Sequence, residues 1–206
     1  MLRALLVIAL FAWHTQAAAD RPTILVLGDS LSAGYGIGAH QGWVALLQQR
    51  LDHQGYRYRV VNASISGDTT RGGLTRLPQA LAQHRPTVVI VELGGNDGLR
   101  GLPLDAMHEN LASIIETSRQ HGAKVLLLGV RLPPNYGASY VNMFHNVYRE
   151  LERAYQVPFV PYLLAGIGGR DALMQADQIH PRAEAQGRML DNVWSRLVPT
   201  LKSSSN

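Results

Sequence analysis

The sequence contains no cysteine, and this absence excludes several kinds of chemistry at once. Thiol catalysis, thiolate metal sites and disulfide bonds all require cysteine side chains. A chain without thiols also tolerates an oxidising compartment, because it has nothing to misoxidise. No H-E-x-x-H motif occurs, and the histidines lie far apart in the sequence, so the pattern does not favour a metal hydrolase.

Charge is scarce, and lysine is nearly missing. Charged residues make up 17% of the chain, below the average of ~25%, which argues against long disordered segments. The net charge of +4 comes almost entirely from arginine, since lysine occurs only at Lys124 and Lys202. The arginines are scattered rather than clustered, so we expect no nucleic-acid partner.

The N-terminal segment has the layout of a secretory signal peptide. Arg3 gives a positive start, an apolar run of ten residues follows, and Ala17-Ala18-Ala19 supplies a small-residue cleavage site. The apolar run is too short for a membrane span, which needs ~20 residues. A buried N-terminal strand or helix is the alternative. We expect residues 1–19 to be removed on export, leaving a periplasmic or secreted protein.

Apolar, strand-like runs alternate with helix-like segments along the rest of the chain. The runs are continuous, which indicates strands buried on both faces. This alternation predicts a parallel sheet with helices on both faces. We therefore predict one flavodoxin-like, three-layer α/β/α domain over residues 20–202, with about five strands and a frayed tail at 203–206. The expected strands are Thr23–Gly28, Tyr58–Asn62, Thr87–Leu93, Lys124–Val130 and Pro158–Pro161, and the expected helices are Gly42–His53, Gly73–His84, Pro103–His121, Tyr140–Tyr155 and Pro181–Leu201.

Residues that could form a hydrolytic site follow the expected strands, at the edge where such folds bind ligands. Ser30 lies at a strand-to-helix turn, where a hydroxyl is exposed near a helix N-terminus. Asp177 and His180 are three residues apart, so one turn can bring the carboxylate to the ring and the ring to Ser30. The alternatives are ordinary ones: Asp29 and Ser30 cap a helix, and His180 precedes a helix that starts at Pro181.

Two further loops on the same edge could stabilise an oxyanion. Gly94-Gly95-Asn96-Asp97 follows the strongest expected strand, and the Asn96 amide is a hydrogen-bond donor. Gly67, in the loop after the second strand, could offer a backbone N–H. Either loop by itself could be a simple turn, because Gly, Asn and Asp are turn residues.

Taken together, these blocks resemble the SGNH hydrolase superfamily, also called GDSL esterases. The four blocks occur in the family's order: Gly28–Ser32, Asn62–Thr69, Gly94–Asp97, and Asp177 with His180. More narrowly, the runs NASISGDTT and ELGGNDGLRG resemble the secreted bacterial group of multifunctional acyl-CoA thioesterases, lysophospholipases and proteases, and arylesterases.

The resemblance implies hydrolysis of esters and thioesters without a cofactor. It implies Ser30, Asp177 and His180 as the catalytic residues and Ser30, Gly67 and Asn96 as the oxyanion donors. It further implies that residues 97–102 form a mobile, substrate-facing loop. Gln178 departs from close relatives, which often have glycine there; we expect its side chain to face outward, with little effect.

The substrate is predicted less sharply. Apolar rim side chains suggest an acyl groove, and packing of the rim is the alternative. We favour medium-to-long acyl esters and thioesters, transient contact with lipid, and a monomer. The rivals are a carbohydrate acetylesterase and a flavodoxin-like binding module, although Gly28–Gly36 lacks a phosphate-loop pattern. The candidate substrate-binding residues are Asp97, Gly98, Leu99, Arg100, Leu102, Pro133, Tyr136 and Ile179, with Leu132 and Pro134 beside them.

Overall fold

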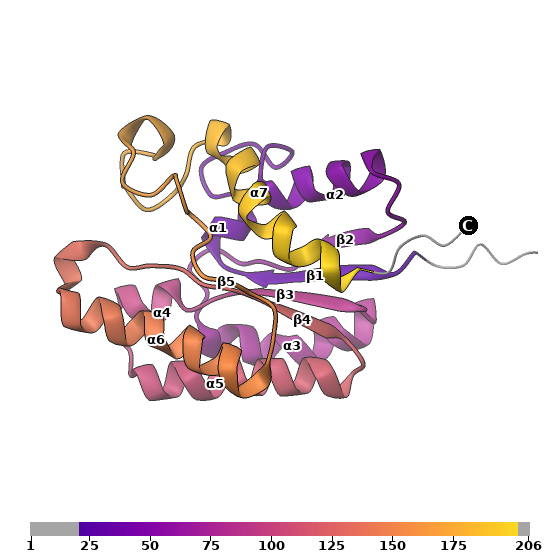
Figure 1. The fold of residues 1–206 in the computed structure, drawn as a ribbon, viewed down its shortest axis with the longest axis horizontal. Helices are drawn as coiled ribbons and strands as arrows, with labels where there is room; N and C mark the ends of the chain where they lie inside the picture. Colours follow the sequence, from indigo (N-terminus) through magenta and orange to yellow (C-terminus); the bar gives the residue numbers. More distant parts are fainter. Residues whose placement is uncertain (1–20, 202–206) are drawn as a thin grey trace, which may run out of the picture.

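The computed structural model describes residues 21–201, so the expected signal peptide and frayed tail lie outside the described residues. A five-stranded, all-parallel sheet forms the centre, in the order β2-β1-β3-β4-β5 (Figure 1). This confirms the predicted three-layer, flavodoxin-like fold. The strands are β1 (Thr23–Gly28), β2 (Arg59–Asn62), β3 (Val88–Glu92), β4 (Lys124–Leu128) and β5 (Phe159–Val160).

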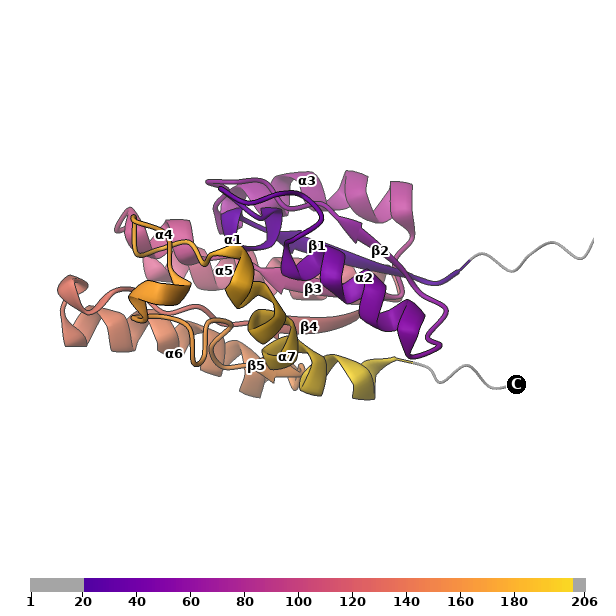
Figure 2. The ribbon, with the colours of Figure 1, turned by 90° about the horizontal axis from the view of Figure 1, so that it is seen from above.

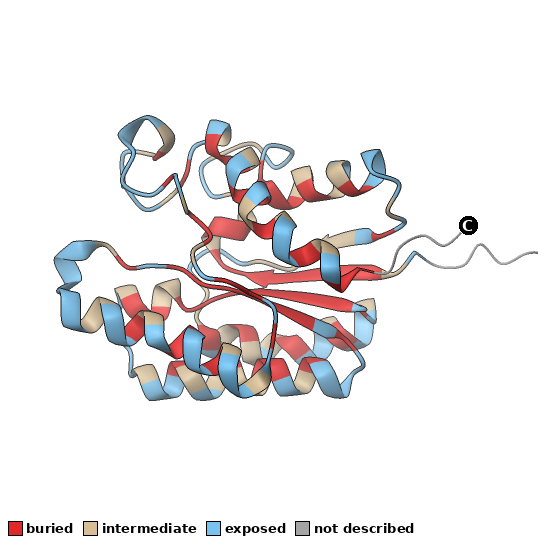
Figure 3. Cartoon of the chain, in the orientation of Figure 1, coloured by how far each residue is buried: buried red, intermediate tan, exposed pale blue. Residues whose placement is uncertain are grey.

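Helices cover both faces of the sheet. Helices α2 (Trp43–His53) and α7 (Gln186–Leu197) lie on one face, and α3 (Thr70–His84), α5 (Leu104–Gln120) and α6 (Ala138–Tyr155) lie on the other (Figures 1 and 2). The inner strands are buried on both sides (Figure 3), as their continuous apolar runs require. No helix within residues 21–201 is long and apolar enough to cross a bilayer.

Several element boundaries differ from the sequence prediction. Helix α3 starts three residues early because the Thr69 side chain accepts a hydrogen bond from the N–H of Gly72 and so caps it. The expected C-terminal helix is interrupted, with 3-10 turns on either side of α7. Pro181 does not begin it, because this residue pairs with Met174 in an isolated bridge. Strand β5 shrinks to two residues.

Two short helices follow strands β1 and β3; the strand-to-helix turn at Ser30 implies the first without giving its bounds, and the second was not predicted. Helix α1 (Ser30–Ala33) directly follows β1, and helix α4 (Gly95–Leu99) follows β3. Neither is long enough to show the apolar periodicity on which a helix prediction depends. Both begin at the carboxyl edge of the sheet, so they bring Ser30 and Asn96 to the same end of the molecule (Figure 1).

Candidate active site

The turn between β1 and α1 sets the position of Ser30. Asp29 caps α1, since its Oδ1 accepts the N–H of Leu31 at 3.0 Å, and Ser30 is the first helical residue. Gly28 leaves room for this turn: a Cβ there would lie 2.8 Å from the Cβ of Ser32 and 2.9 Å from Glu92 Oε2. The sequence thus combines a small residue, a capping residue and a hydroxyl in consecutive positions.

Ser30, His180 and Asp177 form a continuous series of hydrogen bonds. The Nε2 atom of His180 lies 2.8 Å from Ser30 Oγ, and its Nδ1 lies 2.6 Å from Asp177 Oδ2. Partial burial opposes ionisation of Asp177, but hydrogen bonds from His180 and from the N–H of Ile179 outweigh it and lower the Asp177 pKa to about 2. Asp177 is therefore a carboxylate that fixes the tautomer and the orientation of the His180 ring.

The loop that carries Asp177 and His180 is held together by hydrogen bonds between its two ends. Gln175 donates its N–H to the carbonyl of His180 at 2.8 Å, beside the Met174–Pro181 bridge. The Gln175 side chain also donates to the carbonyl of Tyr35, whose ring centroid lies 4.5 Å from that of His180. Sequence reasoning missed Tyr35 and Gln175, because neither belongs to a motif.

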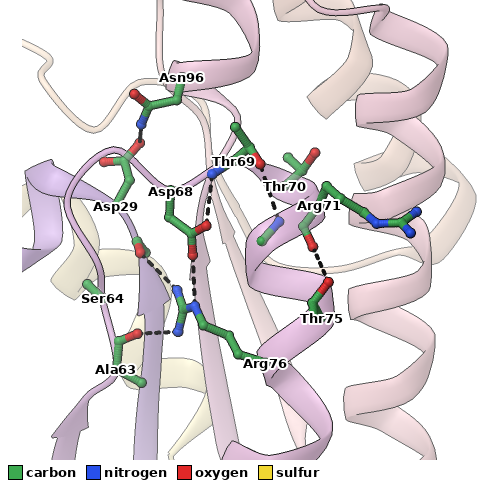
Figure 4. Close-up of polar contacts among 12 residues, drawn as sticks. Asp29, Ala63, Ser64, Asp68, Thr69, Thr70, Arg71, Thr75, Arg76 and Asn96 are labelled. Carbon is green, nitrogen blue, oxygen red and sulfur yellow. Dashed lines mark hydrogen bonds and ion pairs between the residues drawn. The ribbon is translucent and has the colours of Figure 1, made fainter.

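The other two expected oxyanion donors, Gly67 and Asn96, come from the loop after β2 and from α4. The Asn96 amide donates to Asp29 Oδ2 at 3.1 Å, which leaves its second N–H available (Figure 4). Gly67 has a φ of 80°, a left-handed conformation that favours glycine. Arg100 donates to the carbonyl of Gly67 at 2.8 Å and so holds the peptide from outside.

Arg76 on α3 ties this second loop to the nucleophile turn (Figure 4). Its guanidinium donates to the carbonyl of Gly28 at 3.1 Å, to the carbonyl of Ala63 and to the carboxylate of Asp68 at 2.7 Å. One side chain thus satisfies the carbonyls at the ends of two neighbouring strands, which fixes the separation between Ser30 and Gly67. No motif contains Arg76, and only its contacts reveal this role.

An apolar cavity of about 610 Å³ opens beside Ser30. Ser30, Gly67, Asn96 and His180 all line it, whereas Asp177 does not line the cavity and contacts His180 through Nδ1. Of the other candidates, Leu99, Leu132, Pro133, Pro134 and Ile179 line it too. The wall also contains residues that sequence reasoning missed, from the segment after β5: Tyr162, Leu164, Gly168, Gly169 and Met174.

The remaining candidates lie off the cavity wall. Asp97 is buried and accepts the N–H and hydroxyl of Thr70, which locks α4 against α3. Gly98 packs so closely that a Cβ would lie 2.6 Å from the Phe144 ring. Of the three others, Arg100 holds Gly67, Tyr136 donates to the carbonyl of Leu99, and Leu102 is exposed.

The segment expected to be a loop over 97–102 is in part helical, since α4 extends to Leu99. A hydrogen bond from the N–H of Leu102 to the carbonyl of Asp97 joins the two ends of this segment. Gln178 has a φ of 56°, in the left-handed region that favours glycine, and this exposed residue also borders the cavity. Within residues 21–201, no three His, Asp or Glu side chains gather to hold a metal ion.

Comparison with known proteins adds independent information. Residues 26–188 match the GDSL-like lipase/acylhydrolase family. The chain is 54% identical to esterase TesA of Pseudomonas aeruginosa, over 97% of this chain and 100% of that protein. It is 41% identical to the Escherichia coli thioesterase 1/protease 1/lysophospholipase L1, over 95% and 97% of the two chains. A crystal structure of TesA superposes with a TM-score of 0.86 at 55% identity, covering 87% of this chain and 99% of that one.

Proposed function

This chain belongs to the GDSL-like lipase/acylhydrolase family and is an ester-hydrolysing enzyme, and we propose that it acts through an acyl-enzyme on Ser30. The observation that carries the proposal is the series of hydrogen bonds from Ser30 through His180 to Asp177, with distances of 2.8 and 2.6 Å. A hydroxyl is a weak nucleophile unless an adjacent base removes its proton, and an oriented imidazole supplies that base.

In the acylation step, Ser30 Oγ attacks the substrate carbonyl carbon while His180 Nε2 takes the hydroxyl proton. The negative charge that develops on the carbonyl oxygen is stabilised by the backbone N–H groups of Ser30 and Gly67 and by the Asn96 amide. Asp177 stabilises the resulting imidazolium. His180 then gives its proton to the leaving alcohol or thiol, and the carbonyl re-forms as an ester of Ser30.

Deacylation reverses the roles. A water molecule gives a proton to His180 Nε2 as its oxygen attacks the acyl carbon, and the same donors stabilise the second oxyanion. His180 then returns the proton to Ser30 Oγ as the bond to the acyl group breaks. The acid leaves, and the enzyme returns to its starting state.

The Ser30→Ala variant tests the nucleophile. We expect it to fold normally, to lose hydrolysis of p-nitrophenyl esters and to resist covalent labelling by a fluorophosphonate, because no hydroxyl remains to attack. Ser139→Ala is the matched control, since Ser139 is an exposed serine on α6 and its loss leaves labelling intact. Full activity in Ser30→Ala would overturn the assignment.

The cavity supports medium-to-long acyl esters and thioesters as substrates. Its wall beyond Ser30 consists mainly of apolar side chains from the segments after β4 and β5, which suit an alkyl chain. We expect kcat/KM to rise from acetyl through octanoyl p-nitrophenyl esters. A preference for acetyl would point to the carbohydrate acetylesterase instead.

Export is part of the proposal. The family relatives are aligned over nearly the whole chain, and the apolar run before Ala19 has the composition of a signal peptide. Expression in a bacterial host is expected to yield a periplasmic protein whose first residue is Asp20. N-terminal sequencing of the secreted fraction measures this, and an intact Met1 in that fraction would contradict it.

A further inference from the structure

A second carboxyl group lies beneath the nucleophile turn, and the mechanism above does not use it. Glu92 is the last residue of β3, it is paired in register with Gly28 of β1, and it is 0% exposed. Isolated charges are rarely buried to this extent, because transfer from water costs several kcal/mol unless a partner compensates for it. The contacts of Glu92 therefore indicate whether its carboxyl group is ionised or protonated.

Only one of the two Glu92 oxygens meets hydrogen-bond donors. Oε2 accepts the Ser32 hydroxyl at 2.7 Å and lies 3.4 Å from the backbone nitrogen of Asp29. Oε1 is buried and meets no donor among the described residues. An oxygen that meets no donor is satisfied when it carries a proton and donates to an acceptor. The neighbouring Asp29 carboxyl is such an acceptor, and hydrogen bonding between the two side chains contributes to the electrostatics of both.

No cation within residues 21–201 forms an ion pair with either carboxyl group. The charged or titratable groups around the pair come from four elements. Tyr148 on α6 interacts electrostatically with both carboxyl groups and with Asp97 of α4. His180, before α7, interacts with Asp29, and Arg76 on α3 donates to the carbonyl of Gly28. Two adjacent buried carboxylates without a cation repel one another, so one of them holds a proton.

The proton belongs on Glu92. Burial, followed by the charge of Asp29, raises the pKa of Glu92 well above its usual value. Burial raises the pKa of Asp29 to only about 6, because the N–H of Leu31, the Glu92 side chain, His180 and Asn96 all favour its charged form. At neutral pH this leaves Glu92 as the donor and Asp29 as the acceptor.

We propose that Glu92 is a positioning residue for the oxyanion hole: in its protonated form it donates to Asp29 and keeps that carboxylate ionised to accept one N–H of Asn96. The inference rests on the proposed function, since Asn96 is oriented by Asp29 at 3.1 Å so that its other N–H can serve the oxyanion. Glu92 touches no substrate and acts through two other side chains.

Two variants of Glu92 test this. Glu92→Met removes the donor with little change in volume, so Asp29 gains a proton more readily. We expect kcat at pH 7 to fall about tenfold with little change in KM and the acid limb of the kcat profile to move to higher pH. Glu92→Gln keeps a donor toward Asp29 and an acceptor for Ser32, so it is expected to restore kcat to within about threefold and to return the acid limb to its wild-type position.

Two controls separate positioning from packing. Ile90→Val introduces a packing defect in the same strand, where Ile90 is also fully buried, and it is expected to lower stability without moving the pH profile. In infrared difference spectra at pH 7, wild type minus Glu92→Gln is expected to contain the carbonyl band of a protonated carboxylic acid.

Two results would overturn the role of Glu92: a wild-type protein that lacks this infrared band, or a Glu92→Met variant whose kcat falls by one factor at every pH. Neither depends on which residue is the nucleophile. Activity retained in Ser30→Ala would instead overturn the proposed function and leave the infrared result unchanged.

Discussion

Two aspartates flank Ser30, and their surroundings are opposite. Asp177 lies on an exposed loop, where the His180 ring and two backbone N–H groups surround its carboxylate and lower its pKa to about 2. Asp29 is buried beneath the nucleophile turn, where desolvation raises its pKa to about 6. The protein thus stabilises the ionised form of the aspartate at position 177 and destabilises the ionised form at position 29.

The difference in environment matches the different roles that we propose for the two aspartates. In the proposed mechanism the exposed Asp177 orients the base, and folding favours ionisation of this aspartate. The buried Asp29 accepts a hydrogen bond from the Asn96 amide, which we propose stabilises the oxyanion, and folding opposes ionisation of Asp29. Preorganised dipoles in a dry site are effective because they need no rearrangement when charge develops. The stability lost by ionising Asp29 is the cost of that arrangement.

Removing the charge of the exposed Asp177 is expected to have the largest effect on kcat. Asp177→Asn keeps the size of the side chain but no longer fixes the His180 tautomer or stabilises the imidazolium. We expect kcat to fall ~10³–10⁴-fold, as is typical when the aspartate of a serine triad is neutralised. Steady-state kinetics on a p-nitrophenyl ester measure it, and a loss below tenfold would contradict the role given to Asp177.

Removing the amide that the buried aspartate orients is the next largest change. Asn96→Ala is expected to lower kcat ~10²–10³-fold, the usual loss for one oxyanion donor, with KM nearly unchanged. Asn110→Ala is a matched control, because this part-buried amide donates to Thr70 and its loss should affect stability rather than kcat. An unchanged kcat in Asn96→Ala would remove it from the oxyanion hole.

Neutralising the buried aspartate itself should separate stability from activity. Asp29→Asn retains a cap for the N–H of Leu31 but gives up the carboxylate that accepts from Asn96. We expect stability at pH 7 to rise by about 1 kcal/mol while kcat falls about tenfold. Chemical denaturation and kinetics on the same preparation measure both. Asp105→Asn, at an exposed position on α5, should change neither stability nor kcat. An Asp29→Asn variant that is less stable than wild type would refute the inference that burial destabilises the ionised Asp29.

The pH dependence of stability gives the smallest expected effect, and the sign differs between the two aspartates. The Asp29 pKa is raised, so the folded state gains protons as pH falls through about 6, and the thermal midpoints of wild type and Asp29→Asn converge. The Asp177 pKa is lowered, so its contribution is present above about pH 4 and is lost as pH falls toward 2. We expect differences of ~2–4 °C in thermal melts, and midpoints that diverge on acidification from pH 7 to 5 would contradict the sign for Asp29.

The sequence predicts the sheet well, because buried parallel strands appear as continuous apolar runs. It predicts Ser30, Gly67 and Asn96 as candidates because each follows such a run, and it predicts Asp177 and His180 from their three-residue spacing. The sequence does not single out Glu92, because it is the second-to-last residue of the run at 87–93 and looks like one polar residue in a strand. Its role depends on register with Gly28, which a single sequence does not display.

The cavity wall was predicted only in part. The segment after β5 supplies Tyr162 and Met174, but that strand is two residues long and gives little signal. Asp97 and Gly98 were expected at the substrate because the resemblance implies a substrate-facing loop over 97–102, whereas both are buried residues of helix α4. A rotation of 100° per residue separates adjacent helical side chains, and a loop prediction contains no such information.

The hydrogen bond between Ser30 and His180 joins residues that are 150 positions apart. All five strands end by Val160, so every residue of the sheet precedes His180 in the chain. A chain cut before Asp177 would therefore contain the strands, Ser30, Gly67 and Asn96 but would lack the base that we propose. In the proposed mechanism, catalytic turnover would then report that the segment carrying His180 is present and docked against the first strand–helix turn.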